Sequence, residues 1–250
     1  SDVCSSDLVP PVVTHEGKRA LEVTYAAGRI HGGATNCECA LRPAGAFPAD
    51  AVRVAYAIWL DDSFPLEPTA SHAVGGKLGG LFIGSGDADG GRYSTTGASF
   101  RLTFDDHGAA VAYFYPQVRR DYVGRNPPWS VLDQSPEVRA HAVVATGVHL
   151  FRDGQRLRLR KRQWNTVELA CRLNTPGKYD GLLQLTVNGA TRSLSTVRYR
   201  YDAARVTSFR LGTFFGGSTS NYAPARPTKA WFADFRVTAA GQREIGRAHV

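Results

Sequence analysis

The stretch that decides the fold runs Ser99-Phe-Arg-Leu-Thr-Phe-Asp-Asp-His-Gly-Ala-Ala-Val-Ala-Tyr-Phe-Tyr115, two alternating segments around a turn signal. Because the side chains of a strand alternate between its faces, Ser99 and Arg101 share one face and the phenylalanines take the other. If residues 106–108 form a three-residue hairpin loop with Gly108 in the left-handed conformation, Arg101 falls opposite Tyr113 and Ser99 opposite Tyr115. Four hydrogen-bonding side chains then share one patch of a rigid sheet, a suitable surface to hold a sugar.

Strand signals recur along the rest of the chain, while long helical periodicity is hard to find. Glycine and proline are frequent, 26 and 13 of 250 residues, and turn residues separate short runs rich in Val, Thr, Tyr and Phe. Besides the hairpin, we expect strands at 20–25, 52–60, 166–173, 183–187, 191–197, 209–215 and 230–237. Asn188-Gly189 is the strongest short hairpin signal. The pattern predicts a single all-β domain: a jelly-roll β-sandwich of two antiparallel sheets with one concave substrate groove.

Two connecting stretches have their own character. Residues 117–149 contain Asn126-Pro127-Pro128-Trp129, and we expect them to form an excursion over the surface. Residues 156–164 alternate Arg and Lys with apolar residues, which is more typical of a solvated strand face than of a nucleic-acid-binding stripe.

Both ends of the chain look foreign to it. Residues 2–8 and 244–250 can be encoded by nearly reverse-complementary DNA that resembles a sequencing adapter read on opposite strands. We therefore expect residues 1–8 and 244–250 to be artefacts and residues 9–243 to form the domain. Setting these ends aside removes two aspartates and one Glu–Arg pair, which raises the formal charge of +8 by two.

The strongly basic charge favours an anionic partner, such as nucleic acid, an acidic polysaccharide or a membrane surface. No apolar run is long enough to cross a bilayer. Without Cys4 the cysteines are Cys37, Cys39 and Cys171, an odd set without metal-type spacing. One of the first two could pair with Cys171, or all could be buried free thiols.

The segment Gly75-Gly76-Lys77-Leu78-Gly79-Gly80-Leu81 lets the backbone approach a ligand or a neighbouring strand closely, with one lysine standing out. The turn-rich loop 87–97 carries Arg92 and Tyr93. The histidines lack metal-ligand spacing, and Asp87 with Asp89 offers too few acids for a calcium site. We therefore expect neither a metal nor another cofactor.

These motifs together resemble the polysaccharide lyase family 14 domain, which includes alginate and glucuronan lyases. The resemblance runs from about Leu21 to Val237 and rests on the order of several short motifs. They are the Gly-Gly-Lys77-Leu-Gly-Gly-Leu segment, Gly90-Gly91-Arg92, Ser99-Phe-Arg101, Ala112-Tyr113-Phe-Tyr115, Trp164-Asn165-Thr166-Val167, the 174–181 turn and Phe214-Phe-Gly-Gly. The resemblance implies a β-jelly roll and eliminative cleavage of polyuronates.

Carried over by motif position, the family's catalytic set corresponds to Lys77, Ser99, Arg101, Tyr113 and Tyr115. Arg92 and Tyr93 are candidate substrate-binding residues. The chain departs from the family in having Gly79 where proline is usual, and a histidine found in some members between the lysine and the serine is not matched. Tyr93 lies in that neighbourhood, and the 117–149 segment is longer than usual.

The chemistry explains why such a set is needed. Elimination requires support for the C6 carboxylate, a base for the C5 proton and an acid for the departing O4. We expect Arg101 and Ser99 to position the carboxylate, since a guanidinium grips it with two parallel hydrogen bonds. Lys77 and either Tyr113 or Tyr115 would share the acid and base roles, with nearby positive charge lowering the pKa of the phenol.

Three alternatives stay open at this point. A non-catalytic jelly roll that binds acidic carbohydrate would keep the groove without turnover. A glycoside hydrolase would need two carboxylates across the scissile bond, and the expected face is not acidic. Nucleic-acid binding fits the charge but lacks a recognisable module. The favoured hypothesis is a monomeric polysaccharide lyase acting on an anionic polysaccharide, with no nucleic-acid or membrane partner and an extracellular location inferred from the substrate class.

Overall fold

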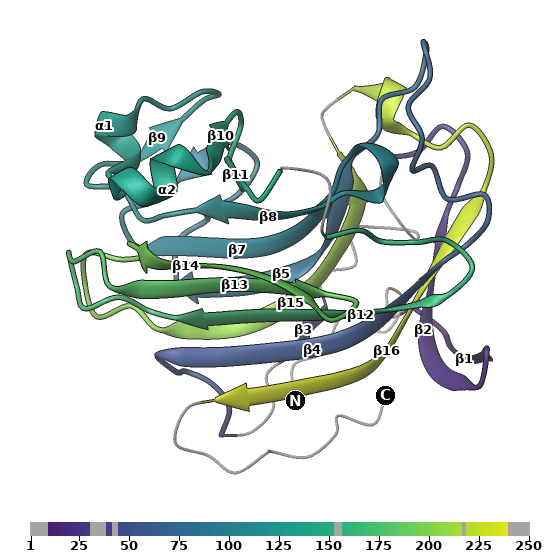
Figure 1. The fold of residues 1–250 in the computed structure, drawn as a ribbon, viewed down its shortest axis with the longest axis horizontal. Helices are drawn as coiled ribbons and strands as arrows, with labels where there is room; N and C mark the ends of the chain where they lie inside the picture. Colours follow the sequence, from purple (N-terminus) through teal and green to yellow (C-terminus); the bar gives the residue numbers. More distant parts are fainter. Residues whose placement is uncertain (1–9, 31–38, 42–44, 153–156, 217–218, 240–250) are drawn as a thin grey trace.

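The computed structural model describes residues 10–30, 39–41, 45–152, 157–216 and 219–239. Two seven-stranded antiparallel sheets pack face to face, as Figure 1 shows. This arrangement confirms the predicted all-β jelly-roll sandwich. The 1–8 and 244–250 ends lie outside the described residues.

Sheet A has the order β1 (Val12–His15), β2 (Lys18–Tyr25), β16 (Thr228–Ala239), β4 (Ala51–Leu60), β12 (Trp164–Arg172), β13 (Gly181–Val187), β14 (Ala190–Val197). Sheet B has the order β10 (Ala142–Val144), β11 (Val148–Leu150), β8 (Ala110–Tyr115), β7 (Gly97–Phe104), β5 (Gly76–Gly84), β15 (Val206–Phe215), β3 (Cys39–Leu41). A separate ribbon pairs β6 (Arg92–Tyr93) with β9 (Tyr122–Val123). Short helices are α1 (Trp129–Leu132), α2 (Pro136–Ala140) and two 3₁₀ turns, Asp106–Gly108 and Ser220–Tyr222.

The central hairpin β7–β8 has the predicted register. Ser99 pairs with Tyr115 and Arg101 with Tyr113, and the turn places Gly108 at φ +72°. Phe100 and Phe114 point from this hairpin into the core between the sheets, where both are fully buried. Every residue of β7 and β8 is buried, on both faces. The face turned away from sheet A, which we call the site face, is therefore covered rather than open.

Part of that cover comes from residues 117–149. The sequence predicted a surface excursion, and the structure shows that it also adds strands β10 and β11 to the edge of sheet B beside β8. Register places Val148 opposite Phe114 and His149 opposite Tyr113. The excursion therefore reaches the site face itself.

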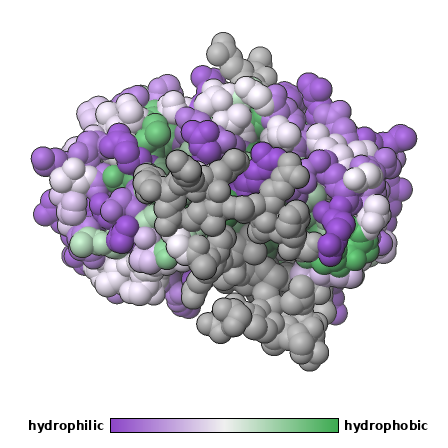
Figure 2. Space-filling view, turned by 90° about the horizontal axis from the view of Figure 1, so that it is seen from below, coloured by the Kyte–Doolittle hydropathy of each residue, from purple (hydrophilic) through white to green (hydrophobic). Residues whose placement is uncertain are grey.

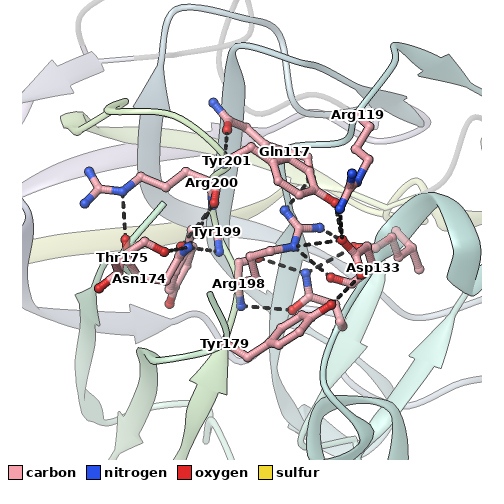
Figure 3. Close-up of polar contacts among 12 residues, drawn as sticks. Gln117, Arg119, Asp133, Asn174, Thr175, Tyr179, Arg198, Tyr199, Arg200 and Tyr201 are labelled. Atoms are coloured by element: carbon pink, nitrogen blue, oxygen red, sulfur yellow. Dashed lines mark hydrogen bonds and ion pairs between the residues drawn. The ribbon is translucent and has the colours of Figure 1, made fainter. Parts of the chain in front are cut away.

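A buried arginine fastens this excursion to the sandwich (Figure 3). Arg198 is fully buried and donates to the main-chain oxygens of Asp133, Gln117 and Leu132 at 2.8, 3.2 and 2.7 Å. Its guanidinium carbon also lies 3.7 Å from the centroid of the Tyr201 ring. Because a buried charge without partners is costly, these contacts hold both the start and the middle of the excursion against the segment after β14.

A β-bulge in β5 changes which side chains reach the site face. Lys77 pairs with Thr103 and Gly80 with Arg101, so two residues of β5 oppose one residue of β7 between these pairs. Gly79, inside the bulge, has φ +108°. The extra residue shifts the alternation by one, so Lys77 joins Gly80 on the site face while Leu78 and Leu81 are buried in the core.

The strand expected at 156–164 does not form as a regular strand over its described residues. Among the described residues of 156–164, the chain forms single bridges, Ala109 with Arg158 and Leu60 with Lys161, instead of a regular strand. Arg162 adopts φ +58°, which interrupts an extended conformation. Leu157 and Leu159 are still buried, as the alternation implies.

Cys171 in β12 is a free, buried thiol, and burial raises its pKa to about 12. The candidate partner Cys37 and the side chain of Cys39 lie outside what the structure describes.

The face seen from below Figure 1 is largely polar. Most of its described residues in Figure 2 are hydrophilic or neutral, with hydrophobic residues in a few small groups. Among the described residues, no helix combines the length and hydropathy needed to span a bilayer.

Candidate active site

The site is built on one row of paired residues that crosses sheet B. His149 of β11 pairs with Tyr113 of β8, Tyr113 with Arg101, Arg101 with Gly80, and Gly80 with Arg210 of β15. Paired residues of neighbouring strands point to the same face. The row therefore brings a histidine, a tyrosine and two arginines to the site face. Ser99 and Tyr115 lie in the next row on that face.

Arg101 and Ser99 both contact the loop that precedes β6. The Ser99 hydroxyl donates to the Ala88 carbonyl at 2.5 Å, and the Arg101 Nη2 donates to the same oxygen at 3.2 Å. The Asp89 carboxylate lies 3.1 Å from the same Arg101 nitrogen. Only 6% of the Arg101 side chain is exposed, and its Nε is buried without a hydrogen-bond partner among the described residues. We name residues 85–91 the cover loop.

Lys77 lies beside the tyrosines, as its proposed role requires. Its Nζ is 5.1 Å from the centroid of the Tyr113 ring and 4.4 Å from that of Phe214, its cross-strand partner. The bulge at Gly79 is what turns Lys77 to this face. Proline is incompatible with φ +108°, and a Cβ at this position would meet Phe209 at 2.9 Å, which explains why this chain has glycine there.

Tyr113 and Tyr115 form a hydrogen-bonded pair. Their hydroxyl oxygens are 2.8 Å apart, and the Gly91 N–H donates to the Tyr115 hydroxyl at 3.1 Å. Burial raises the pKa of both phenols above the usual value of about 10, although Arg101 opposes the shift. The predicted lowering of the phenol pKa is therefore wrong, because desolvation outweighs the nearby positive charge.

The two phenols differ in the hydrogen bonds that their oxygens accept. Either hydroxyl can donate in their mutual hydrogen bond, whereas the Gly91 N–H donates to the Tyr115 oxygen alone and opposes the rise in the pKa of Tyr115. A donor fixed by the backbone stabilises a negative charge on the oxygen it points to. The Gly91 N–H would thus stabilise a negative charge on the Tyr115 oxygen, while Tyr113 lies beside Lys77.

The tyrosine pair is enclosed by residues from two segments, β6 and the turn before β11. The Tyr93 ring packs at a tilted angle against the Tyr115 ring, with centroids 4.8 Å apart, and the Tyr93 hydroxyl donates to the Thr146 carbonyl at 3.1 Å. A Cβ added to Gly147 would lie 2.7 Å from Tyr113 and 2.8 Å from Tyr115. Arg92 is exposed and lies 3.8 Å from the Asp87 carboxylate. The substrate-binding role of Arg92 and Tyr93 stays a prediction, and Tyr93 here supports the Tyr115 ring.

His149 is a residue of this cluster that sequence reasoning missed. Its ring meets the Tyr113 ring edge to face, with centroids 4.7 Å apart. Burial, with Arg152 and Lys77 as further causes, lowers its pKa from 6.5 to about 4, so the imidazole is neutral at neutral pH. The signal that could have found it is the Val-His-Leu alternation at 148–150, which marks a short strand after a glycine.

A cavity opens beside this cluster, and basic, aromatic and acidic residues line it. Its charged walls are Lys77, Arg101, Arg210 and Asp89, with Phe82 and Phe214 as the aromatic walls. Within the described ranges, no group of three His, Cys, Asp or Glu side chains is placed to hold a metal ion. The arrangement supplies donors and cations for a carboxylate next to two hydrogen-bonded phenols.

Comparison with known proteins agrees with this arrangement. The sequence model of polysaccharide lyase 14 matches residues 13–235. No curated protein sequence matches the chain significantly.

Solved structures share the fold. An alginate lyase from Chlorella virus is 25% identical, with a TM-score of 0.73 over 92% of this chain and 88% of that one. A marine PL-14 alginate lyase from Aplysia kurodai is 20% identical, with a TM-score of 0.71 over 93% and 87%. An endo-β-1,4-glucuronan lyase from Trichoderma reesei is 13% identical, with a TM-score of 0.52 over 93% and 85%. With the family model spanning most of the chain and the predicted residues gathered on one face of the sheet, the protein belongs to the polysaccharide lyase 14 family.

Proposed function

We propose that the protein cleaves a uronic-acid-containing polysaccharide, such as alginate or glucuronan, by β-elimination. The observation that carries this proposal is the meeting of Arg101 and Ser99 with the hydrogen-bonded phenols of Tyr113 and Tyr115, beside Lys77. The structural neighbours named as alginate and glucuronan lyases support the same substrate class.

In the proposed reaction, the C6 carboxylate lies against Arg101, with the Ser99 hydroxyl as a second donor. Charge that develops on the carboxylate as C5 loses its proton is then stabilised by a guanidinium that is already in place. The tyrosine pair accepts the C5 proton, the C4–O4 bond breaks, a C4–C5 double bond forms, and O4 leaves with a proton.

The tyrosines act as one coupled unit in this scheme, because their hydroxyl oxygens are in direct contact. Tyr113 lies nearer Lys77, and the Tyr115 oxygen accepts from Gly91. Binding of substrate in place of the cover loop would put the sugar next to this pair. Lys77 supplies the second cation and the proton for O4.

The test is absorbance at 235 nm, where the unsaturated product absorbs, on a panel of mannuronate, guluronate and glucuronate polymers. Tyr113→Phe and Tyr115→Phe should each lower kcat by about 100-fold or more, the usual contribution of a positioned proton-transfer group. Tyr179→Phe is the matched control, since its phenol bonds Asp133 outside this cluster. Full activity in both single variants would overturn the assignment.

The same assay distinguishes the proposed lyase from the main alternative, a non-catalytic module that binds acidic carbohydrate. That alternative predicts affinity for polyuronates without a new double bond. The buried, mutually bonded phenols favour the enzyme, because binding alone does not require two tyrosines enclosed away from solvent.

A monomeric state and an extracellular location belong to the proposal as well, the latter because a polymer of this kind is degraded outside the cell. Size-exclusion chromatography with light scattering tests the first. Recovery of lyase activity from the culture supernatant of the source organism tests the second.

A further inference from the structure

Arg210 lies on the site face two strands away from Arg101. The row described above runs from Arg101 through Gly80 to Arg210, so two inter-strand spacings, roughly 9–10 Å, separate the two backbones. Their side chains converge on one ring: the guanidinium carbons of Arg101 and Arg210 are 4.7 and 4.1 Å from the centroid of Phe82. The two cationic groups are therefore closer together than their backbones.

The residue between the two arginines has no side chain. A Cβ at Gly80 would lie 2.5 Å from the Cγ of Arg101 and 2.6 Å from the Phe100 carbonyl oxygen. The space over Gly80 is thus taken by the Arg101 side chain itself. Glycine at this point in the row lets Arg101 lie across β5 toward Phe82 and Arg210.

Arg210 also connects two cavities. The cavity beside Lys77 and a second cavity toward Phe47 and Pro48 share Phe82, Asp89 and Arg210 as walls. Asp87 and Asp89 are the acidic groups of the second cavity, and Arg210 is its basic group. An anionic chain that leaves Arg101 in this direction passes Arg210, which offsets the repulsion from the two aspartates.

We propose that Arg210 binds the carboxylate of a second uronate, a neighbour in the chain of the uronate whose carboxylate lies at Arg101. Stacking on Phe82 leaves the edge of a guanidinium able to bind a carboxylate with two parallel hydrogen bonds. The substrate then crosses the strands of sheet B along the row, and the site selects runs of charged uronates over sequences in which uronates alternate with neutral sugars. This inference rests on the proposed function, because it takes Arg101 as the first carboxylate site.

The experiment compares wild type, Arg210→Gln and Arg210→Lys with the control Arg205→Gln, an exposed arginine next to β15 that pairs with Asp50. Steady-state kinetics on a polyuronate at fixed low salt should show KM raised about 10-fold or more in Arg210→Gln, with kcat within twofold of wild type. Charge-assisted hydrogen bonds are strong enough for this effect. The KM of Arg210→Lys should lie between those of wild type and Arg210→Gln, because the lysine ammonium keeps the charge but cannot form two parallel hydrogen bonds to a carboxylate.

A length series of oligouronates makes the test specific, measured by calorimetry with Tyr115→Phe present in both proteins so that the oligomers are not cleaved during the titration. The protein that keeps Arg210 should gain affinity at the chain length that first reaches Arg210, and the protein with Arg210→Gln should lose that gain while keeping the affinity for shorter oligomers. Equal length dependence in the two proteins, or a KM within twofold of wild type, overturns the inference. Absence of unsaturated product in wild type would instead overturn the proposed function, and the calorimetric comparison would still decide the role of Arg210. A melting temperature equal to wild type excludes misfolding as the cause.

Discussion

The Asp89 carboxylate lies 3.1 Å from the guanidinium Nη2 of Arg101, on the side chain expected to hold the substrate carboxylate. The Ala88 carbonyl oxygen accepts from the same nitrogen and from Ser99. The cover loop thus places a carboxylate and a carbonyl oxygen against the two residues that would bind a uronate. Substrate must displace these groups to reach the tyrosines.

The Asp89→Asn variant should therefore bind polyuronate more tightly. The Asp89 carboxylate and the substrate carboxylate compete for Arg101. Removing one negative charge from this partly exposed ion pair favours the substrate by about 1 kcal/mol, which corresponds to a KM roughly fivefold lower. Initial rates at 235 nm over a range of polymer concentrations measure this effect. Asp234→Asn, whose carboxylate pairs with Lys18 on sheet A, is the control and should leave KM near the wild-type value. A KM for Asp89→Asn that rises would show that Asp89 assists substrate binding.

Gly147→Ala should lower kcat, by roughly 10-fold or more, without abolishing folding. The new Cβ would press on the Tyr113 and Tyr115 rings at 2.7 and 2.8 Å, so the phenols must move, and small misplacements of reacting groups are costly. Gly17→Ala is the opposite control: its φ of +78° strains an alanine, but no atom lies within 4 Å. That variant should lose stability and keep kcat. Wild-type kcat in Gly147→Ala would mean that the rings tolerate displacement.

Stability should fall on acidification because of His149. Its pKa in the folded protein is about 4, below the usual 6.5, so the unfolded chain binds more protons between these values. The contribution is complete above about pH 6.5 and is lost as the pH falls toward 4, with a limit of about 3 kcal/mol.

Urea unfolding at pH 7, 6, 5 and 4.5 measures this dependence. His149→Gln should show a smaller decrease in the free energy of unfolding across that window, while the exposed His141→Gln should follow wild type. Parallel curves for wild type and His149→Gln would contradict the assignment.

Arg198→Met should destabilise the protein by about 3 kcal/mol, the typical cost of breaking a buried charge network from one side. The carbonyl oxygens of Asp133, Gln117 and Leu132 lose their donor, and the Asp133 carboxylate loses a cation 3.6 Å away. Arg119→Met removes an exposed arginine 3.8 Å from the same carboxylate and should change stability little. Denaturant midpoints compare the two, and equal midpoints would show that Arg198 is replaceable.

The structure could be predicted from the sequence wherever two local signals agreed. The β7–β8 register followed from strict alternation around a turn that needs Gly108, and the β13–β14 hairpin from Asn188-Gly189, both of which adopt positive φ. Fold class, the main strands and the shared face of Ser99, Arg101, Tyr113 and Tyr115 could be predicted for this reason.

Features that depend on long-range packing could not be predicted. Strict alternation does not reveal the β5 bulge that turns Lys77 toward the tyrosines, because a bulge adds one residue without a unique local signature. His149 lies far along the chain from Tyr113, and only the pairing of β11 with β8 brings them together. The direction of the phenol pKa shifts also required the cover over the site, since burial, not residue type, determines it.

The row that crosses sheet B takes one residue from each of five neighbouring strands. A slip of one residue in any of these strands would turn its member of the row into the core, because the faces alternate with every residue. Turnover therefore requires all five strands to be paired correctly at once. Recovery of lyase activity after dilution from denaturant would consequently measure completed sheet assembly, a later event than the return of β-structure seen by circular dichroism.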